Sequence, residues 1–222
     1  MNGAAAPRPV VILISGRGSN MRTLIERSHE PDSPYRVALV VSDRPDAPGL
    51  AAARDLGVDT ETVSPASGGD RSAYDRALAG AVARREPALV ALAGCMRILT
   101  APFVDAFAGR MLNIHPSLLP KYPGLHTHRR ALAAGDSVHG ATVHFVTAAL
   151  DAGPAVIQGR LEIAPGEDEA RLAGRVLAIE HRIYPLAVRW FCEGRLECRG
   201  GRAWFDGAAL ESPLQLTSIE RE

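Results

Sequence analysis

The sequence has little cysteine, little lysine and no excess of charge of either sign. Its 222 residues include three cysteines, at positions 95, 192 and 198, and no CxxC pair. That pattern excludes a disulfide framework and a structural zinc knuckle, and it fits a reducing cytoplasm. The 25 basic residues, of which Lys121 is the single lysine, are balanced by 25 acidic residues. Zero net charge argues against a protein that coats nucleic acid, because such binding needs many excess cations.

Long apolar runs are missing too. The longest, at residues 10–14 and 88–93, have the length of single strands, so we expect no segment that spans a membrane. The first nine residues are rich in alanine and proline and lack the apolar core of a signal peptide. We therefore expect a cytoplasmic protein with neither a membrane nor a nucleic acid as its partner.

Strand-like and helix-like segments alternate through the first half of the chain. Strand-like runs fall at residues 9–14, 36–41, 58–63, 88–93 and 111–114, with helix-like segments at 21–27, 49–56, 70–85 and 100–107. This alternation predicts an α/β fold with a doubly wound, mainly parallel sheet flanked by helices. Ser19 or Asn20 is the expected N-cap of the first helix. Ligands of such sheets bind where the strands end, here at residues 15–20, 42–45, 94–99 and 113–116.

The second half has a different pattern. A proline-rich loop at residues 115–128 precedes a short helix at 127–134, strands at 140–146 and 155–163, and a long helix at 168–193 that contains Pro185. Gly200 and Gly201 predict a hairpin turn. We expect a disordered lead-in over residues 1–8, a single domain over 9–207, and a tail over 208–222 that is loosely ordered after Glu211.

A glycine-rich turn follows the first strand, with the sequence Ser-Gly-Arg-Gly-Ser-Asn at residues 15–20. Glycines let the backbone approach a phosphate, and the free N–H groups at a helix start attract an anion. Met21 replaces the third glycine of the dinucleotide fingerprint, and the Walker lysine is absent. A phosphate monoester therefore fits better than a pyrophosphate, although a tight turn before a capped helix explains the same residues.

Polar residues gather where the fifth strand should end. Asn113 and His115 lie on one side of an extended chain, where an amide and an imidazole can hold one developing oxyanion. Thr142 and His144 share a face of the next predicted strand, and Asp151 follows in a turn. Each histidine could equally be structural, and Asp151 could bond only its own backbone.

Other candidate sites are weaker. His126 and His128 have no cysteine or carboxylate cluster nearby, so we expect no metal site there. Cys95 follows a strand without a neighbouring base and is expected to be a buried thiol. Residues 1–25 and 106–135 contain no acidic side chain, and both stretches should reach the carboxyl edge of the sheet. A locally positive cleft of this kind attracts an anionic substrate.

Five motifs resemble the folate-dependent phosphoribosylglycinamide formyltransferases. They are Ile-Ser-Gly-Arg-Gly-Ser-Asn at residues 14–20, Leu-Ala-Gly-Cys-Met-Arg-Ile-Leu at 92–99, Leu-Asn-Ile-His-Pro-Ser-Leu-Leu-Pro-Lys-Tyr-Pro-Gly at 112–124, His-Gly-Ala-Thr-Val-His-Phe-Val at 139–146 and Leu-Asp-Ala-Gly-Pro at 150–154. The likeness runs from about residue 10 to 205. It implies the formyltransferase fold with a Rossmann-like N-terminal half, a phosphate-binding half at 9–107, and a folate-binding and catalytic half at 108–207.

The resemblance also implies roles for individual residues. The co-substrate would be 10-formyltetrahydrofolate, with glycinamide ribonucleotide as the formyl acceptor, no metal, and a monomer or weak homodimer. The implied residues are Asn113, His115 and Asp151 for catalysis, Gly18, Ser19, Asn20 and Glu180 for the ribonucleotide, Arg71, Met96, Arg97, Ile98, Leu99 and Asn113 for folate, and Thr142 and His144 in support. Arg17 and Cys95 depart from the family pattern.

Several alternatives stay open. Methionyl-tRNA formyltransferases share the loop at residues 117–120 but need a further domain, and formyltetrahydrofolate hydrolases usually carry an N-terminal regulatory domain. A non-enzymatic nucleotide-binding module is a different class. A dinucleotide oxidoreductase would use Asp43, but Met21 argues against it. Lys121 lies in the most diagnostic loop, and we expect an electrostatic or solvated side chain rather than a catalytic one.

Overall fold

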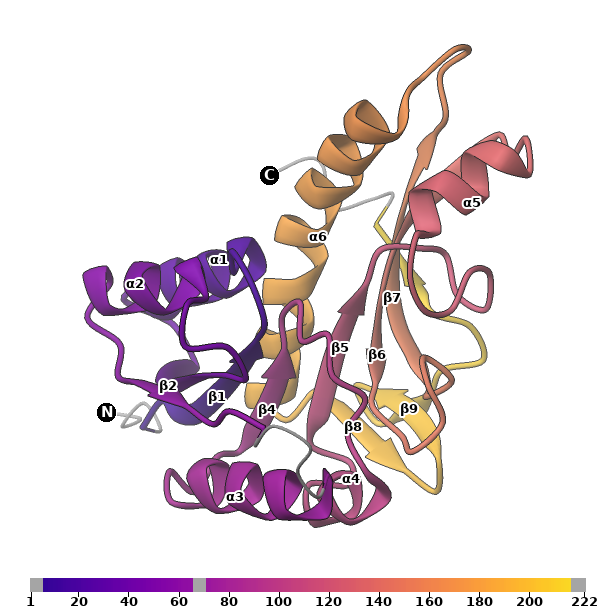
Figure 1. Cartoon of the computed structure of the whole chain (residues 1–222). Helices are drawn as coiled ribbons and strands as arrows, with labels where there is room; N and C mark the ends of the chain where they lie inside the picture. The colour runs from indigo at the N-terminus through magenta and orange to yellow at the C-terminus, as the bar shows by residue number, and fades with distance from the viewer. Residues whose placement is uncertain (1–5, 66–70, 217–222) are drawn as a thin grey trace.

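A computed structural model describes residues 6–65 and 71–216. Within these ranges a central sheet has the strand order β11-β7-β6-β5-β4-β1-β2-β3 (Figure 1). The parallel strands are β1 (Arg8–Ile14), β2 (Tyr35–Ser42), β3 (Thr60–Thr62), β4 (Leu89–Leu92) and β5 (Met111–His115). Next to them, β6 (Val138–Phe145) and β7 (Ala155–Glu162) run antiparallel, and β11 (Leu214–Gln215) pairs parallel to β7. The sheet is therefore mainly parallel, as the sequence predicts.

Helices cover both faces of the sheet, because its central strands are apolar on both sides. In β1, Val10, Ile12 and Ile14 pack into a core with α1 (Ser19–Ser28), α2 (Pro48–Asp55) and α6 (Glu169–Cys192). Val11 and Leu13 point into a second core with α3 (Arg71–Ala83) and α4 (Ala101–Ala106). The remaining helix, α5 (Thr127–Ala133), packs against α6 (Figure 1).

The long helix α6 links the two halves of the sheet. The Asp168 side chain caps its start and accepts a hydrogen bond from the Arg171 N–H at 2.8 Å. In its middle, the buried Tyr184 hydroxyl lies 3.0 Å from the carbonyls of Leu92 in β4 and Leu112 in β5. This contact fixes the helix against the strands that lead to the polar residues of β5.

A small second sheet follows α6. It consists of β8 (Leu196–Arg199), β9 (Arg202–Phe205) and β10 (Ala208–Ala209), all antiparallel. Gly200 and Gly201 have φ of 57° and 75° in the turn between the first two, which confirms the predicted hairpin. The Phe205 ring lies 4.8 Å from the Trp190 ring of α6 and so holds the small sheet against the main body.

Three expectations at element ends need correction. Neither Ser19 nor Asn20 caps α1: Gly18 is the N-cap, with φ of 70°, and no side chain of the described residues caps the helix. The tail is ordered beyond Glu211 as far as Leu216, because β11 adds to the edge of β7. The predicted lead-in includes Arg8, which already belongs to β1, while residues 1–5 and 217–222 lie outside the described ranges.

The sequence predicts no membrane-spanning segment. Among residues 6–65 and 71–216, no helix has the length and apolar character needed to cross a bilayer.

Candidate active site

A cavity of about 430 Å³ opens at the carboxyl ends of β1, β4 and β5. Its wall combines residues from the beginning, middle and end of the chain: Asn20, 94–98, 113–116, 124–128, Leu150, Asp151 and Glu180. Asn20 comes from the first acid-free stretch and residues 113–128 from the second, so the two stretches meet at this edge of the sheet. Asn113, His115 and Asp151, the three residues predicted to be catalytic, therefore line the same cavity.

The imidazole of His115 sits between a carboxylate and a carbonyl. Its Nδ1 lies 3.5 Å from Asp151 Oδ2, and its Nε2 lies 2.9 Å from the Tyr122 carbonyl, to which it can donate. Both the His115 and Asp151 side chains are buried. The contact at Nδ1 is longer than a well-formed hydrogen bond, so Nδ1 is the ring atom available to a substrate oxygen.

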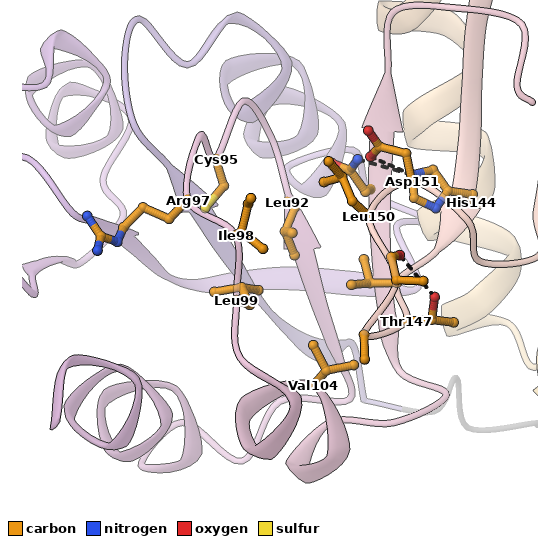
Figure 2. Close-up of a pocket in the computed structure, with 14 residues that line it drawn as sticks. Leu92, Cys95, Arg97, Ile98, Leu99, Val104, His144, Thr147, Leu150 and Asp151 are labelled. Carbon is orange, nitrogen blue, oxygen red and sulfur yellow. Dashed lines mark hydrogen bonds and ion pairs between the residues drawn. The ribbon is translucent and has the colours of Figure 1, made fainter. Parts of the chain in front are cut away.

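Asp151 is held by the backbone of the proline-rich loop. The Gly124 N–H donates to Asp151 Oδ2 at 2.8 Å, and Asp151 itself adopts a left-handed conformation with φ of 50°. Its other oxygen, Oδ1, lies 3.7 Å from His144 Nε2 (Figure 2). A strained backbone at a buried carboxylate is common at functional sites.

His144 orients the Asn113 amide. Its Nδ1–H donates to the Phe145 carbonyl at 2.9 Å, which leaves Nε2 as the acceptor for Asn113 Nδ2 at 3.1 Å. Burial lowers the pKa of His144 and so favours this neutral form. The second N–H of the Asn113 amide remains available to a substrate oxygen. His144 thus lies behind the Asn113 amide, and its supporting role stays a prediction.

Thr142 supports the site from a greater distance. Its hydroxyl donates to the Ser117 carbonyl at 2.6 Å and accepts from the Leu119 N–H at 3.1 Å. Gln158, on β7, donates to the same hydroxyl at 3.1 Å. These bonds fix the start of the proline-rich loop on β6, one strand away from His115.

Glu180 and Asn20 form a buried pair that lines the same cavity. Asn20 Nδ2 donates to Glu180 Oε2 at 2.6 Å, across 160 residues of sequence. Burial raises the pKa of Glu180 to about 7, although the Asn20 hydrogen bond lowers it in part. Asn20 is itself buried, and its Oδ1 has no partner among the described residues. Both side chains are poised to bind hydroxyl or amine donors of a ligand.

The glycine-rich turn forms a second cavity beside the first. We call it the loop cavity, and it is lined by residues 15–20, Arg44, Ala93, Gly94 and Met96. Gly18 and Ser19, both predicted phosphate contacts, belong to this wall, and Asn20 lines both cavities. Because no described side chain caps α1, its first N–H groups are free for an anion.

The segment at residues 94–99 forms a narrow apolar pocket on the other side. Leu92, Ile98, Leu99 and Val104 face the chain at 146–150 across it (Figure 2). The Arg97 side chain points away from the pocket and stacks 4.5 Å over the Tyr74 ring. Exposed apolar side chains continue the pocket toward the main cavity, namely Met96, Ile98, Leu125 and Leu150. A flat, partly apolar ligand fits such a pocket.

Arg71 is placed differently from the other predicted folate residues. It lies on α3 and lines neither the main cavity nor the apolar pocket. Its guanidinium donates to the Ile98 carbonyl, while Asp75, one turn further along α3, accepts from the Thr100 N–H at 2.7 Å. In this structure, α3 therefore braces the segment that forms the pocket.

The side chains expected to be inactive have structural surroundings. His128 Nδ1 lies 3.1 Å from His139 Nε2, and the described ranges hold no group of three histidine, cysteine or acidic residues fit for a metal. Burial raises the pKa of Cys95 to about 11, so its thiol stays protonated at neutral pH. Lys121 Nζ pairs with Asp136 Oδ1 at 2.8 Å and lies outside the main cavity.

Two backbone contacts of the site have no signal in the sequence. They are the Tyr122 carbonyl beside His115 and the Gly124 N–H on Asp151. Both come from the proline-rich loop, where Tyr122 has φ of 57° and Gly124 has φ of 77°. Main-chain groups carry no residue-type signature, so only the three-dimensional path of the loop reveals them.

The fold is that of an α/β enzyme with a doubly wound sheet, and its candidate site is a cavity at the carboxyl edge of that sheet. A model of the formyl transferase family matches residues 8–188, and the chain belongs to that family. It is 47% identical over 201 residues to the phosphoribosylglycinamide formyltransferase of Escherichia coli, covering 90% of this chain and 95% of that protein.

Solved structures agree with this assignment. Phosphoribosylglycinamide formyltransferase from Coxiella burnetii superposes with a TM-score of 0.90 and 42% identity, covering 94% of this chain and 99% of that one. Glycinamide ribonucleotide transformylase 1 from Symbiobacterium toebii superposes with a TM-score of 0.88 and 45% identity, covering 92% and 97%. The predicted formyltransferase fold is confirmed.

Proposed function

We propose that this enzyme transfers the formyl group of 10-formyltetrahydrofolate to the amine of glycinamide ribonucleotide. The products are formylglycinamide ribonucleotide and tetrahydrofolate, and the step belongs to purine (IMP) biosynthesis in the cytoplasm. The names of the relatives support the acceptor, since the Escherichia coli and Coxiella burnetii proteins are both phosphoribosylglycinamide formyltransferases. The observation that carries the proposal is the cluster of Asn113, His115 and Asp151 in the wall of the main cavity, next to the loop cavity.

The two cavities suit the two substrates. The loop cavity, with free N–H groups at the start of α1, is matched to a phosphate monoester, and Glu180 with Asn20 would hold the ribosyl and glycinamide part. The apolar pocket would take the pterin, with backbone groups of Arg97 and Leu99 along its wall. Met96 and Ile98 would cover the co-substrate where they are exposed in the free protein.

The chemistry follows from the cluster. The acceptor amine attacks the formyl carbon, and the carbonyl oxygen gains negative charge. Asn113 Nδ2 and a protonated His115 donate hydrogen bonds to that oxygen, while Asp151 stabilises the imidazolium. Asp151 also assists transfer of the amine proton, through a water molecule, to the tetrahydrofolate nitrogen. The bond between that nitrogen and the formyl carbon then breaks as the carbonyl re-forms, which releases tetrahydrofolate and the formylated amine. Holding both substrates in adjoining cavities supplies a large part of the rate acceleration, and the route needs neither a metal nor a covalent enzyme intermediate.

A three-arm assay tests the proposal. The purified protein is mixed with 10-formyltetrahydrofolate alone, with glycinamide ribonucleotide added, or with the ribonucleotide alone, and tetrahydrofolate is followed by absorbance. We expect tetrahydrofolate in the second arm only, together with formylated ribonucleotide by mass spectrometry. Tetrahydrofolate plus formate in the first arm would indicate a hydrolase instead. Ligand binding without turnover in any arm would indicate a nucleotide-binding module.

We also propose a monomer or a weak homodimer in solution. The described residues assemble one complete cavity from a single chain, so the site needs no second copy. Sedimentation at several protein concentrations measures this directly.

A further inference from the structure

We propose that Arg17, in the middle of the glycine-rich turn, is a specificity residue for the phosphate of the acceptor substrate. The inference deepens the proposed function and rests on it, because it assigns the loop cavity to a phosphate monoester. Its starting point is that Arg17 lies in the wall of this cavity and is exposed. The turn before α1 therefore places a guanidinium beside the free N–H groups of the helix.

The path of the turn directs its N–H groups away from α2. The Gly49 N–H donates to the Gly16 carbonyl at 3.0 Å, and a Cβ at Gly49 would lie 3.3 Å from the Arg17 carbonyl. Both carbonyls thus face α2. In a trans peptide the N–H points opposite to the C=O, so the N–H groups of Arg17 and Gly18 point away from α2. Gly18, at φ of 70°, then turns the chain into α1.

Of the two arginines in this wall, Arg17 is the uncommitted one. The Arg44 guanidinium is paired with Asp46, at 3.2 Å and 3.4 Å, and this carboxylate neutralises it. Arg17 has no hydrogen-bond or ion-pair partner within residues 6–65 and 71–216. The sequence reinforces this, since residues 1–25 contain no acidic side chain. A guanidinium without a counter-ion can form a bidentate pair with phosphate oxygens.

An independent feature of the loop cavity, the buried Asn20 amide, points to a polar ligand. Asn20 is 8% exposed and lines both the loop cavity and the main cavity, and its Oδ1 has no partner in the described part of the chain. A ligand that reaches from the turn toward Glu180 would give this buried acceptor the donor that it lacks. Such a ligand would carry an anion at the Arg17 end and N–H or O–H groups at the Asn20 end, as a phosphorylated ribosyl amide does.

The test compares two acceptors in four proteins. The acceptors are glycinamide ribonucleotide and its dephosphorylated riboside, and the proteins are wild type, Arg17→Ala, Arg17→Lys and Arg22→Ala. Arg22 is the matched control: it is exposed on the next turn of α1, 4.0 Å from Glu26, and outside both cavities. Both alanine variants remove one positive charge from the same helix end.

We expect Arg17→Ala to raise the KM for the ribonucleotide about tenfold, the effect of losing a charge-assisted hydrogen bond, with kcat unchanged. The kcat/KM for the riboside and the KM for 10-formyltetrahydrofolate should stay within about twofold of wild type, since neither carries a phosphate for Arg17 to contact. Arg17→Lys should recover part of the loss, and Arg22→Ala should match wild type.

Three outcomes would overturn the assignment. They are an unchanged ribonucleotide KM in Arg17→Ala, an equal loss with the riboside, and an equal loss in Arg22→Ala, which would indicate a long-range field instead of a contact. If the wild-type protein turns over the ribonucleotide and any of these three results is found, only the assignment of Arg17 is refuted. If the wild-type protein does not turn over the ribonucleotide, the proposed function itself is refuted.

Discussion

At the scale of single residues, His115 has the strongest link between position and chemistry. We expect His115→Ala to lower kcat by about 10²–10⁴, the usual contribution of a positioned acid or base, and to leave the dissociation constants of both substrates nearly unchanged. Single-turnover kinetics with equilibrium titration separates the two effects. Lys121→Arg is the control from the same loop, since an arginine can keep the ion pair with Asp136, and its turnover should stay near wild type. Normal turnover in His115→Ala would refute the mechanism, and a large loss in Lys121→Arg would show that the lysine does more than pair with Asp136.

Glu180 carries a second prediction at this scale. Burial raises its pKa to about 7 in the folded protein, above the usual 4.5 of a glutamate, so the folded state disfavours the carboxylate. Wild type therefore loses stability as the pH rises from about 4.5 through 7. Glu180→Gln removes this loss and keeps an acceptor for Asn20, so it should be more stable than wild type at pH 8 by about 3 kcal/mol, at 1.36 kcal/mol per unit of pKa displacement. At pH 4.5 the two proteins should unfold at similar urea concentrations. A gain of equal size at both pH values would contradict the ionisation argument.

At the scale of elements, β6 and β7 approach each other more closely than a side chain allows. A Cβ at Gly140 would lie 2.0 Å from the Gly159 carbonyl oxygen, so the backbone itself would have to move. We expect Gly140→Ala to lower the free energy of unfolding by about 3 kcal/mol. Gly174→Ala is its counterpart on α6, where an added Cβ meets no atom of the described residues within 4 Å. There alanine should raise stability by about 0.5–1 kcal/mol. Urea unfolding of both variants measures the contrast, and equal effects would refute it.

The same scale shows what could be predicted from the sequence. Strands such as β1 and β4 are continuous apolar runs bounded by turn residues, so the ends of each run locate the strand within one or two residues. The prediction that Ser19 or Asn20 caps α1 is wrong because the N-cap is Gly18. Gly18 has a left-handed backbone and no side-chain oxygen. The short β11 was missed because two residues that add to the edge of β7 leave no periodic pattern.

The partners within the site were harder to predict. Spacing along a strand places Asn113 beside His115, but the pairing of Asn20 with Glu180 spans 160 residues and depends on how α6 crosses the sheet. Only the resemblance to a known family predicted that Glu180 and Asp151 belong to the same site. The role of Arg71 remains a prediction, since its hydrogen bond to the Ile98 carbonyl supports the folate segment from outside the pocket.

At the scale of the whole molecule, zero net charge conceals a segregated arrangement. The two acid-free stretches meet at the cavity edge, while the acidic Glu26 pairs with Arg22 outside both cavities. Such a field favours the approach of an anionic substrate without making the protein basic overall. Three of the seven histidines, His128, His139 and His144, lie in the antiparallel half, around β6.

This cluster of histidines makes the whole fold sensitive to acid. Burial lowers the pKa of all three, that of His139 to about 4, so the folded state favours neutral rings. Their contribution to stability is complete above the unfolded pKa of about 6.5 and is lost as the pH falls through the folded values. We therefore expect the three histidines together to lower the free energy of unfolding from pH 6.5 to 4.5, in opposition to the single Glu180. His139→Gln, which can still bond His128, should reduce the slope by up to about one proton per molecule. His29→Gln, at an exposed position after α1, should leave it unchanged. Urea titrations across this range would refute the interpretation if the two variants gave the same slope.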